Sequence, residues 1–301
     1  MKTTLRIFRT IFKLLLLAYV TVVNFFFITV FYSLLLTIIR HICPGCVPGL
    51  FDEGLVPHLI NTMPFYLLSL FILYTLSPLK VWMMRRKEGY RPLGGVERVR
   101  LERLLSEMGM DRKLNLYRNG DARANAVTFG FNTVGITDGM IRQASDEELK
   151  GVICHELGHI AHYDFVYRVL LFSMESFGSR CLYGIFLIPA LIFGIIGGMV
   201  SALVPALGFV GELAGKFWWG LYRLLHFVIY GISRIADVNI NKYGEYRCDA
   251  YAVRYGCGLL SFLYRLKRAE DMRGECPTFS EYILSTHPAT EKRIVRLEKL
   301  L

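Results

Sequence analysis

The chain has 301 residues, of which 53% are hydrophobic and 20% are charged, and its mean hydropathy is +0.39. This composition is too apolar for an ordinary soluble domain, and it carries too much charge for a protein that lies wholly in lipid. The formal net charge is +10, but many Lys and Arg residues lie close to apolar runs, where membrane topology and anionic headgroups account for them. We therefore expect a protein with membrane and water-facing parts and no nucleic-acid partner.

Two charge-free apolar runs, 14–39 and 59–79, lie near the N-terminus. The first has 26 residues, enough to cross a hydrocarbon core, and is too long for a signal peptide. Lys and Arg residues precede the first run and follow the second, so we expect the N-terminus and everything after residue 80 in the cytoplasm and the intervening loop outside.

The loop between these runs contains the sequence CPGC, from Cys43 to Cys46. A redox pair would be accompanied by a βαβ pattern, and none surrounds this segment. A structural disulfide in an oxidising compartment, or two unpaired thiols, is the favoured interpretation. The seven cysteines of the chain show no paired framework, so we assign the segment no chemistry.

From about residue 89 the composition becomes that of a water-facing domain. A helix is predicted over 96–108, ended by Gly109. The apolar residues that recur along it at helical spacing are Val96, Val99, Leu104 and Leu105. Three extended segments follow at 113–117, 124–131 and 133–139, separated by turn-forming residues. They predict a small antiparallel sheet.

The segment GVICHELGHIAHYDF, 151–165, lies on the next predicted helix, which a capping box of Ser145 and Glu148 begins. Residues four apart share one helix face, so the imidazoles of His155 and His159 converge on one metal ion, with Glu156 beside them. Such a pattern arises by chance about one time in a hundred or less in a chain of this length. The alternative of exposed polar residues on an ordinary helix is therefore disfavoured.

Zinc suits two imidazoles with a carboxylate, and Glu156 is placed to take the proton from an attacking water. The segment NKYGEYRCDAYAV, 241–253, offers Glu245 as a third ligand, with Asp249 one turn later to steady a ligand histidine. Cys248 is an alternative third ligand. His162 falls at the edge of the ligand face, so we expect it in solvent or facing substrate.

These motifs, in this order, resemble one family. Two N-terminal membrane runs are followed by ANAVTFG, DEELKGVICHELGHIAHYD, a further hydrophobic hairpin, EYRCDAYAV and STHPATEKRI. The arrangement is similar to the HtpX-like membrane zinc metallopeptidases, which are relatives of the CAAX prenyl proteases. The resemblance covers nearly the whole chain and is far more specific than the five-residue signature alone.

The resemblance implies one zinc ion per chain, with His155, His159 and Glu245 as its ligands. It also implies that Glu156 acts as the general base and that Asp249 supports a ligand histidine. The implied architecture is an α+β membrane protein: a gluzincin-like helical metallopeptidase domain with a small antiparallel sheet and about four transmembrane helices. The implied location is the bacterial inner membrane, with the active site on the cytoplasmic side.

Further residues receive roles by the same resemblance. Asn125 and Ala126 would lie on an edge strand that pairs with the substrate backbone, and His287 would bind substrate or stabilise the oxyanion. Asp164 matches a position that we expect to be structural. The chain has Val127 where relatives usually carry an aromatic residue, so we expect an altered pocket shape.

The segment between the ligands must cross the membrane an even number of times, because His155 and Glu245 share one zinc. Residues 181–211 are free of charge, and 217–232 form a weaker span, with GELAGK between them as an outer turn. The alternative is one re-entrant or interfacial hairpin, because the run is rich in Gly and Pro.

The sequence thus divides into four segments. They are a transmembrane hairpin (1–88), a cytoplasmic peptidase part with the signature helix (89–178), a second transmembrane hairpin (179–236) and a peptidase part with the third ligand (237–301). The charges around the signature helix place the site at the cytoplasmic membrane surface rather than in the bilayer core.

The favoured function is a zinc endopeptidase that cleaves membrane or misfolded proteins in membrane protein quality control, with protein or peptide substrates and the lipid bilayer as partners. A CAAX-type prenyl-peptide protease is the rival of the same class. A metal transporter is the alternative from another class, and it would need ionisable residues within several spans.

Overall fold

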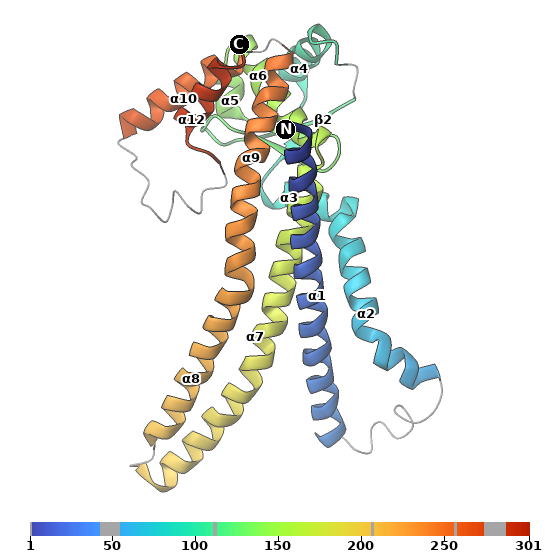
Figure 1. The fold of residues 1–301 in the computed structure, drawn as a ribbon, viewed down its shortest axis with the longest axis vertical. Coiled ribbons are helices and arrows are strands. Elements are labelled where there is room, and N and C mark those ends of the chain that lie inside the picture. The colour runs from blue at the N-terminus through green and yellow to red at the C-terminus, as the bar shows by residue number, and fades with distance from the viewer. Residues whose placement is uncertain (1, 43–54, 111–112, 206–207, 256–257, 274–286) are drawn as a thin grey trace. The chain divides into compact units, whose positions relative to one another are not determined.

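The computed structural model describes residues 2–42, 55–110, 113–205, 208–255, 258–273 and 287–301. These residues are mostly helical and include one small sheet (Figure 1). The helices are α1 (Lys2–Ile42), α2 (Leu55–Leu76), α3 (Pro78–Lys87), α4 (Gly95–Glu107), α5 (Asp138–Gln143), α6 (Asp146–Ala161), α7 (Asp164–Leu203), α8 (Gly208–His226), the π-helical η2 (Phe227–Gly231), α9 (Ile232–Arg254), α10 (Leu259–Arg273) and α12 (Thr290–Glu298). The CPGC segment lies outside the described residues.

Contacts divide the chain into two compact units, each made of two separate segments. The first unit comprises 1–75 and 170–234, and the second comprises 76–169 and 235–301. Both segments of the second unit carry parts of the zinc motif, because His155 and Glu245 fall in different segments. The four segment boundaries expected from the sequence stay predictions.

The first unit holds the long apolar helices. Within the described residues, 7–42 and Asp164–Leu203 are long and apolar enough to cross a membrane. The helices at 61–76 and 78–87 are bent by 60° and would count as a third crossing if they form one span. The expected number of four membrane spans therefore remains a prediction.

The expected outer turn at 211–216 is wrong, because these residues lie inside α8. The reason is a close approach of two glycines: a Cβ on Gly197 would lie 2.6 Å from Gly211 Cα. Such pairs of small residues let two helices pack closely, and Figure 1 shows α7 and α8 as neighbours. Gly211 thus serves helix packing, and the chain leaves α7 after Leu203.

Polar side chains join α1, α7 and the η2–α9 region within the first unit. Asn24 on α1 donates to the Met174 carbonyl at 2.6 Å and accepts from the Tyr230 hydroxyl at 2.9 Å. Nearby, the Ser233 hydroxyl donates to Glu175 at 2.6 Å. Hydrogen bonds of this kind stabilise helix association in an apolar medium, where the polar groups have no water as partner.

The sheet has the order β1-β2-β4-β3, with strands β1 (Arg91–Pro92), β2 (Asn115–Asn119), β3 (Ala126–Phe129) and β4 (Thr133–Thr137). The β1–β2 and β3–β4 pairs are antiparallel, but β2 and β4 are parallel, so the expected all-antiparallel sheet is wrong. Every residue of β4 is buried, which places this strand in the middle. β3 is left as an edge strand.

The helix predicted over 96–108 is confirmed as α4, but its buried face differs from the expectation. Leu101, Leu104 and Leu105 are buried, whereas Val96 and Val99 are 82% and 67% exposed. At 100° per residue the two valines lie on the opposite side of the helix from the leucines. The leucine face packs into the core of the second unit.

The signature helix α6 begins with the predicted capping box of Ser145 and Glu148. Two of its glycines bring neighbouring helices close. A Cβ on Gly151 would lie 2.3 Å from the backbone nitrogen of Leu259 on α10, and one on Gly158 would lie 3.0 Å from Cα of Cys248 on α9. These contacts leave almost no room for a side chain, so α9 and α10 pack directly against the backbone of α6.

The Gly151 contact predicts a specific loss of stability. Gly151→Ala should lower the thermal unfolding midpoint of the detergent-solubilised chain by about 2 °C or more, because overpacking against backbone costs about 1–3 kcal/mol. Gly120→Ala is the matched control, since a Cβ there meets no atom within 4 Å. Equal midpoints for the two variants would contradict the packing at Gly151.

Candidate metal centre

Helices α6 and α9 bring together the three residues expected to bind metal. Nε2 of His155 lies 3.3 Å from Oε2 of Glu245, and Nε2 of His159 lies 3.3 Å from Oε1 of the same carboxylate. All three side chains are buried, and one potential ligand atom from each lies within 4.8 Å of the others.

This arrangement fits a zinc ion. Two ligand atoms that are each about 2.0–2.1 Å from a tetrahedral zinc lie about 3.3 Å apart, which matches both nitrogen–oxygen distances. Oε2 of Glu245 is buried and has no hydrogen-bond partner of acceptable geometry among the described residues. Two imidazoles and a carboxylate are also a donor set that zinc accepts.

A carboxylate and an arginine lie behind His155. Its Nδ1 is 2.8 Å from Oδ1 of Asp249, as the sequence led us to expect. Arg293 on α12 donates to both oxygens of Asp249, at 2.6 and 2.9 Å. This bidentate contact fixes the carboxylate that in turn orients the imidazole. Sequence reasoning gave Arg293 no role, although it lies within the STHPATEKRI segment.

A second carboxylate and arginine lie behind His159. Its Nδ1 is 3.2 Å from Oδ2 of Asp164, and Arg247 donates to both oxygens of Asp164 at 2.8 and 2.9 Å. Asp164, expected only to be structural, therefore contacts a candidate ligand. Arg247 was missed, because nothing in its sequence context shows which residue it faces.

Cys248 faces the same side of His159. Its Sγ lies 3.3 Å from Nδ1 of His159, whereas Glu245 faces Nε2 of that ring. Cys248, His159 and Asp164 form a second potential ligand group among the described residues. A single imidazole presents its two nitrogens in opposite directions, so Glu245 and Cys248 do not belong to one site around His155 and His159.

The buried groups stabilise one another electrostatically. Burial opposes the ionisation of Glu245, but its close contacts with His155, His159 and His287 outweigh burial and hold the pKa of Glu245 well below its ordinary value. Burial likewise opposes charging of His159, but Asp164, Cys248 and Glu245 raise its pKa well above the ordinary value. The site thus favours an ionised carboxylate between the two rings.

Glu156 is held by a residue that sequence reasoning missed. The hydroxyl of Thr128, on β3, lies 2.7 Å from Oε2 of Glu156 and 3.0 Å from the Glu156 backbone oxygen. Both side chains are buried. Tyr90 lies nearby: burial and the charges of Glu88, Glu156 and Asp121 raise the pKa of Tyr90 to about 12. The only sequence signal for Thr128 was its position in the ANAVTFG segment.

His287 reaches the same centre from the segment before α12. Its Nδ1 lies 3.0 Å from Oε2 of Glu245, although 62% of its side chain is exposed. His162 instead ends α6 half-buried, with its ring 6.3 Å from that of Tyr251. The structure therefore brings His287 to the candidate ligands, and it places His162 outside both potential ligand groups.

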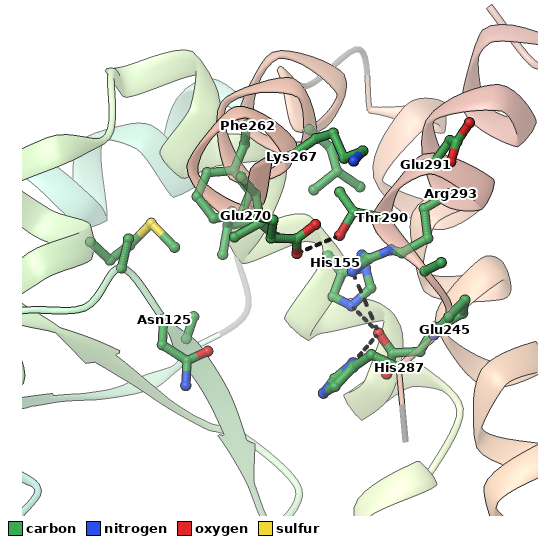
Figure 2. A pocket seen from close by; sticks show the side chains of 18 of the residues that line it. Asn125, His155, Glu245, Phe262, Lys267, Glu270, His287, Thr290, Glu291 and Arg293 are labelled. Atoms are coloured by element: carbon green, nitrogen blue, oxygen red, sulfur yellow. Dashed lines mark hydrogen bonds and ion pairs between the residues drawn. The ribbon is translucent and has the colours of Figure 1, made fainter. Parts of the chain in front are cut away.

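A cavity of about 810 Å³ opens beside these residues (Figure 2). His155, Glu156 and Glu245 line one part of it, and Asn125 and Ala126 line another. Asn125 is exposed and Ala126 is partly buried. Two of the candidate ligands, His155 and Glu245, the candidate base and the strand expected to hold substrate therefore border one continuous space.

Residues 96–301 match the model of peptidase family M48. The chain belongs to this family. The resemblance to the HtpX-like metallopeptidases is confirmed by relatives from several bacteria. A "Protease HtpX homolog" of Aquifex aeolicus is 30% identical over 57% of this chain and 59% of the relative. The corresponding protein of Limosilactobacillus reuteri is 24% identical over 56% of this chain and 59% of the relative.

A third relative, "Protease HtpX" of Shewanella oneidensis, is 23% identical over 62% of this chain and 64% of the relative. The chain thus matches less than two thirds of the length of each of these M48 relatives. Among solved structures, the chain is similar to Ste24p of S. mikatae with a TM-score of 0.47 and 15% identity, over 79% of this chain and 57% of that one.

The geometry predicts which residue completes the metal site. Glu245→Ala should weaken zinc binding by more than the roughly 10- to 100-fold that loss of an outer partner of a ligand costs, because a direct ligand is removed. Cys248→Ala should keep about one zinc per chain, since Sγ faces the other nitrogen of His159. Elemental analysis and competition with a chromogenic chelator measure both. Zinc retained in Glu245→Ala and lost in Cys248→Ala would reverse the assignment.

Proposed function

We propose that this chain is a membrane-anchored zinc-dependent endopeptidase. The observation that carries the proposal is the set of three buried ligand atoms at zinc-like spacing, with Glu156 beside it at the wall of an open cavity. Zinc in this position would polarise a peptide carbonyl and lower the pKa of a water molecule. His155, His159 and Glu245 are the ligands in this proposal.

In this proposal, residues around the ligands transfer the proton, orient the base and stabilise the oxyanion. Glu156 accepts a proton from the attacking water as the oxygen bonds to the carbonyl carbon, and it delivers that proton to the amine as the C–N bond breaks. Thr128 donates to Oε2 of Glu156, which leaves Oε1 to face the water. His287, exposed at the cavity, is placed to donate a hydrogen bond to the developing oxyanion.

The edge strand β3 is the proposed substrate platform. The carbonyl of Asn125 accepts from the Thr137 amide at 3.0 Å, and the Asn125 amide donates to the Thr137 hydroxyl oxygen at 2.9 Å, so these paired residues face each other through the backbone groups of Asn125. Such pairs alternate along an antiparallel ladder, which directs the backbone groups of Ala126 and Thr128 away from β4. A peptide can pair there as an added strand, recognised mainly through its backbone.

Membrane proteins and misfolded proteins are the proposed substrates. Backbone recognition suits a peptidase that must accept many unfolded chains. The positive charges that flank the first two apolar runs favour a cytoplasmic site, and the similarity to bacterial HtpX proteases favours a bacterial inner membrane. Four spans would return both ligand segments to that side.

The base assignment predicts a variant that binds metal without turnover. Glu156→Gln should retain about one zinc per chain and lose at least about 100-fold in kcat/KM on an internally quenched peptide, because the amide has no basic oxygen for the water proton. Zinc content by elemental analysis is the control for folding. A metal-replete Gln variant with wild-type turnover would remove Glu156 from this role and with it the proposed mechanism.

The Thr128 contact predicts a smaller and selective loss. Thr128→Val should lower kcat by about 10- to 100-fold with KM and zinc content unchanged, since a hydrogen bond to a charged group contributes about 1.5–3 kcal/mol. Thr128→Ser keeps the hydroxyl and should restore kcat. If Thr128→Ser loses as much kcat as Thr128→Val, the hydroxyl does not account for the loss, and the role given to its hydrogen bond with Glu156 is contradicted.

A further inference from the structure

The cavity has an apolar part that begins beside the candidate metal ligands. Val152 lies three residues before His155, so the two share one face of α6. Leu259, Phe262 and Leu266 on α10 continue the apolar wall. Together with the small residue Ala126 on β3, these side chains leave a space suited to a large apolar side chain of the substrate.

Beyond this wall the lining becomes charged. Glu270 and Asp271 lie in the last turn of α10, and Glu291 lies in the first turn of α12. These three carboxylates line the cavity together with the ammonium group of Lys267, and Figure 2 labels Lys267, Glu270 and Glu291. Arg293 does not alter the charge balance between these three carboxylates and Lys267, because its guanidinium is paired with Asp249.

The same carboxylates raise the pKa of one lysine, Lys267. Lys267 is hydrogen-bonded to Asp271, and this contact, with the further charges of Glu291 and Glu270, raises the pKa of Lys267 above its ordinary value. Glu270 also accepts from the Thr290 hydroxyl at 2.8 Å, which fixes its carboxylate between α10 and α12. This part of the cavity, which we term the acidic rim (Glu270, Asp271 and Glu291), carries a surplus of two negative charges over Lys267.

We propose that the cavity recognises the cytoplasmic end of a membrane-spanning segment, where an apolar run gives way to Lys and Arg. The proposal rests on the peptidase function above and names the substrate class for the same site. Transmembrane segments of membrane proteins carry this combination as a rule, since Lys and Arg are concentrated in cytoplasmic loops next to apolar helices. An apolar side chain enters beside Val152 and Phe262, and the basic residues beyond it meet the acidic rim.

The volume supports recognition of more than one side chain. A cavity of about 810 Å³ falls within the range that holds a drug-sized ligand, so an apolar residue and its basic neighbour fit together. Recognition through β3 alone would be indifferent to sequence, because it uses the peptide backbone. The apolar wall and the acidic rim add the selectivity that an edge strand lacks.

Four internally quenched peptides test the proposal on the zinc-loaded full chain in detergent. They differ at one position, Leu or Ala, and at a neighbouring position, Lys or Glu. We expect kcat/KM to be about 10-fold or more higher for Leu than for Ala. We expect a preference of about 5-fold for Lys over Glu at low ionic strength, which shrinks as salt screens the acidic rim.

Variants assign each preference to its part of the cavity. Phe262→Ala should reduce the Leu-to-Ala ratio at least about 3-fold, whereas Met272→Ala, a change on the same helix at a residue that is 82% exposed, should leave it unchanged. The double variant Asp271→Asn, Glu291→Gln should remove the preference in kcat/KM for the Lys peptides over the Glu peptides. Glu102→Gln on α4, which lies outside the cavity lining, should leave that preference unchanged. Each ratio is measured on one preparation, so partial misfolding cancels.

The outcomes separate the two proposals. If the zinc-loaded wild type cleaves none of the four peptides, the peptidase function fails and the substrate class fails with it. If it cleaves all four at equal kcat/KM, or prefers Glu over Lys, the peptidase function stands and the proposed substrate class is overturned. Mapping the cleaved bond by mass spectrometry shows whether the apolar residue lies directly beside it.

Discussion

The close approach of α9 to α6 is the constraint on which the site depends. Gly158 lies on α6 one residue before His159, and a Cβ there would lie 3.0 Å from Cα of Cys248. Because α9 can rest almost on the backbone of α6, the Glu245 carboxylate reaches both ligand imidazoles at 3.3 Å. A larger residue at position 158 would push the helices apart and carry Glu245 away from His155 and His159.

Two pairs of a carboxylate and an arginine lie around this contact. Asp249 with Arg293 lies behind one imidazole, and Asp164 with Arg247 lies behind the other. A buried carboxylate is costly without a partner, so each arginine stabilises the carboxylate that orients a ring. The two arrangements come from different helices, which means that the ligand geometry is correct only when α6, α7, α9 and α12 are all in place.

The sheet contributes to the candidate site through its edge strand β3. β4 is buried along its whole length and takes the centre, so β3 remains at the edge beside α6. The Thr128 side chain of this strand holds Glu156, and the proposed mechanism uses the outward backbone groups of the same strand to pair with a peptide. The alternation of a β-strand makes this division possible, since backbone and side-chain groups point in different directions.

The sequence by itself determined the candidate metal-binding motif. The four-residue spacing of His155 and His159 and the capping box before them are local features of one helix, which periodicity and capping express directly. The two long apolar helices follow from composition in the same way. Only the tertiary structure placed Glu245 against both imidazoles and Cys248 against the other nitrogen of His159. It also set the parallel pairing of β2 with β4 and the contacts of Thr128 and Arg293. These depend on how segments far apart in the chain approach one another, and that approach is set by packing at a few glycines rather than by local periodicity.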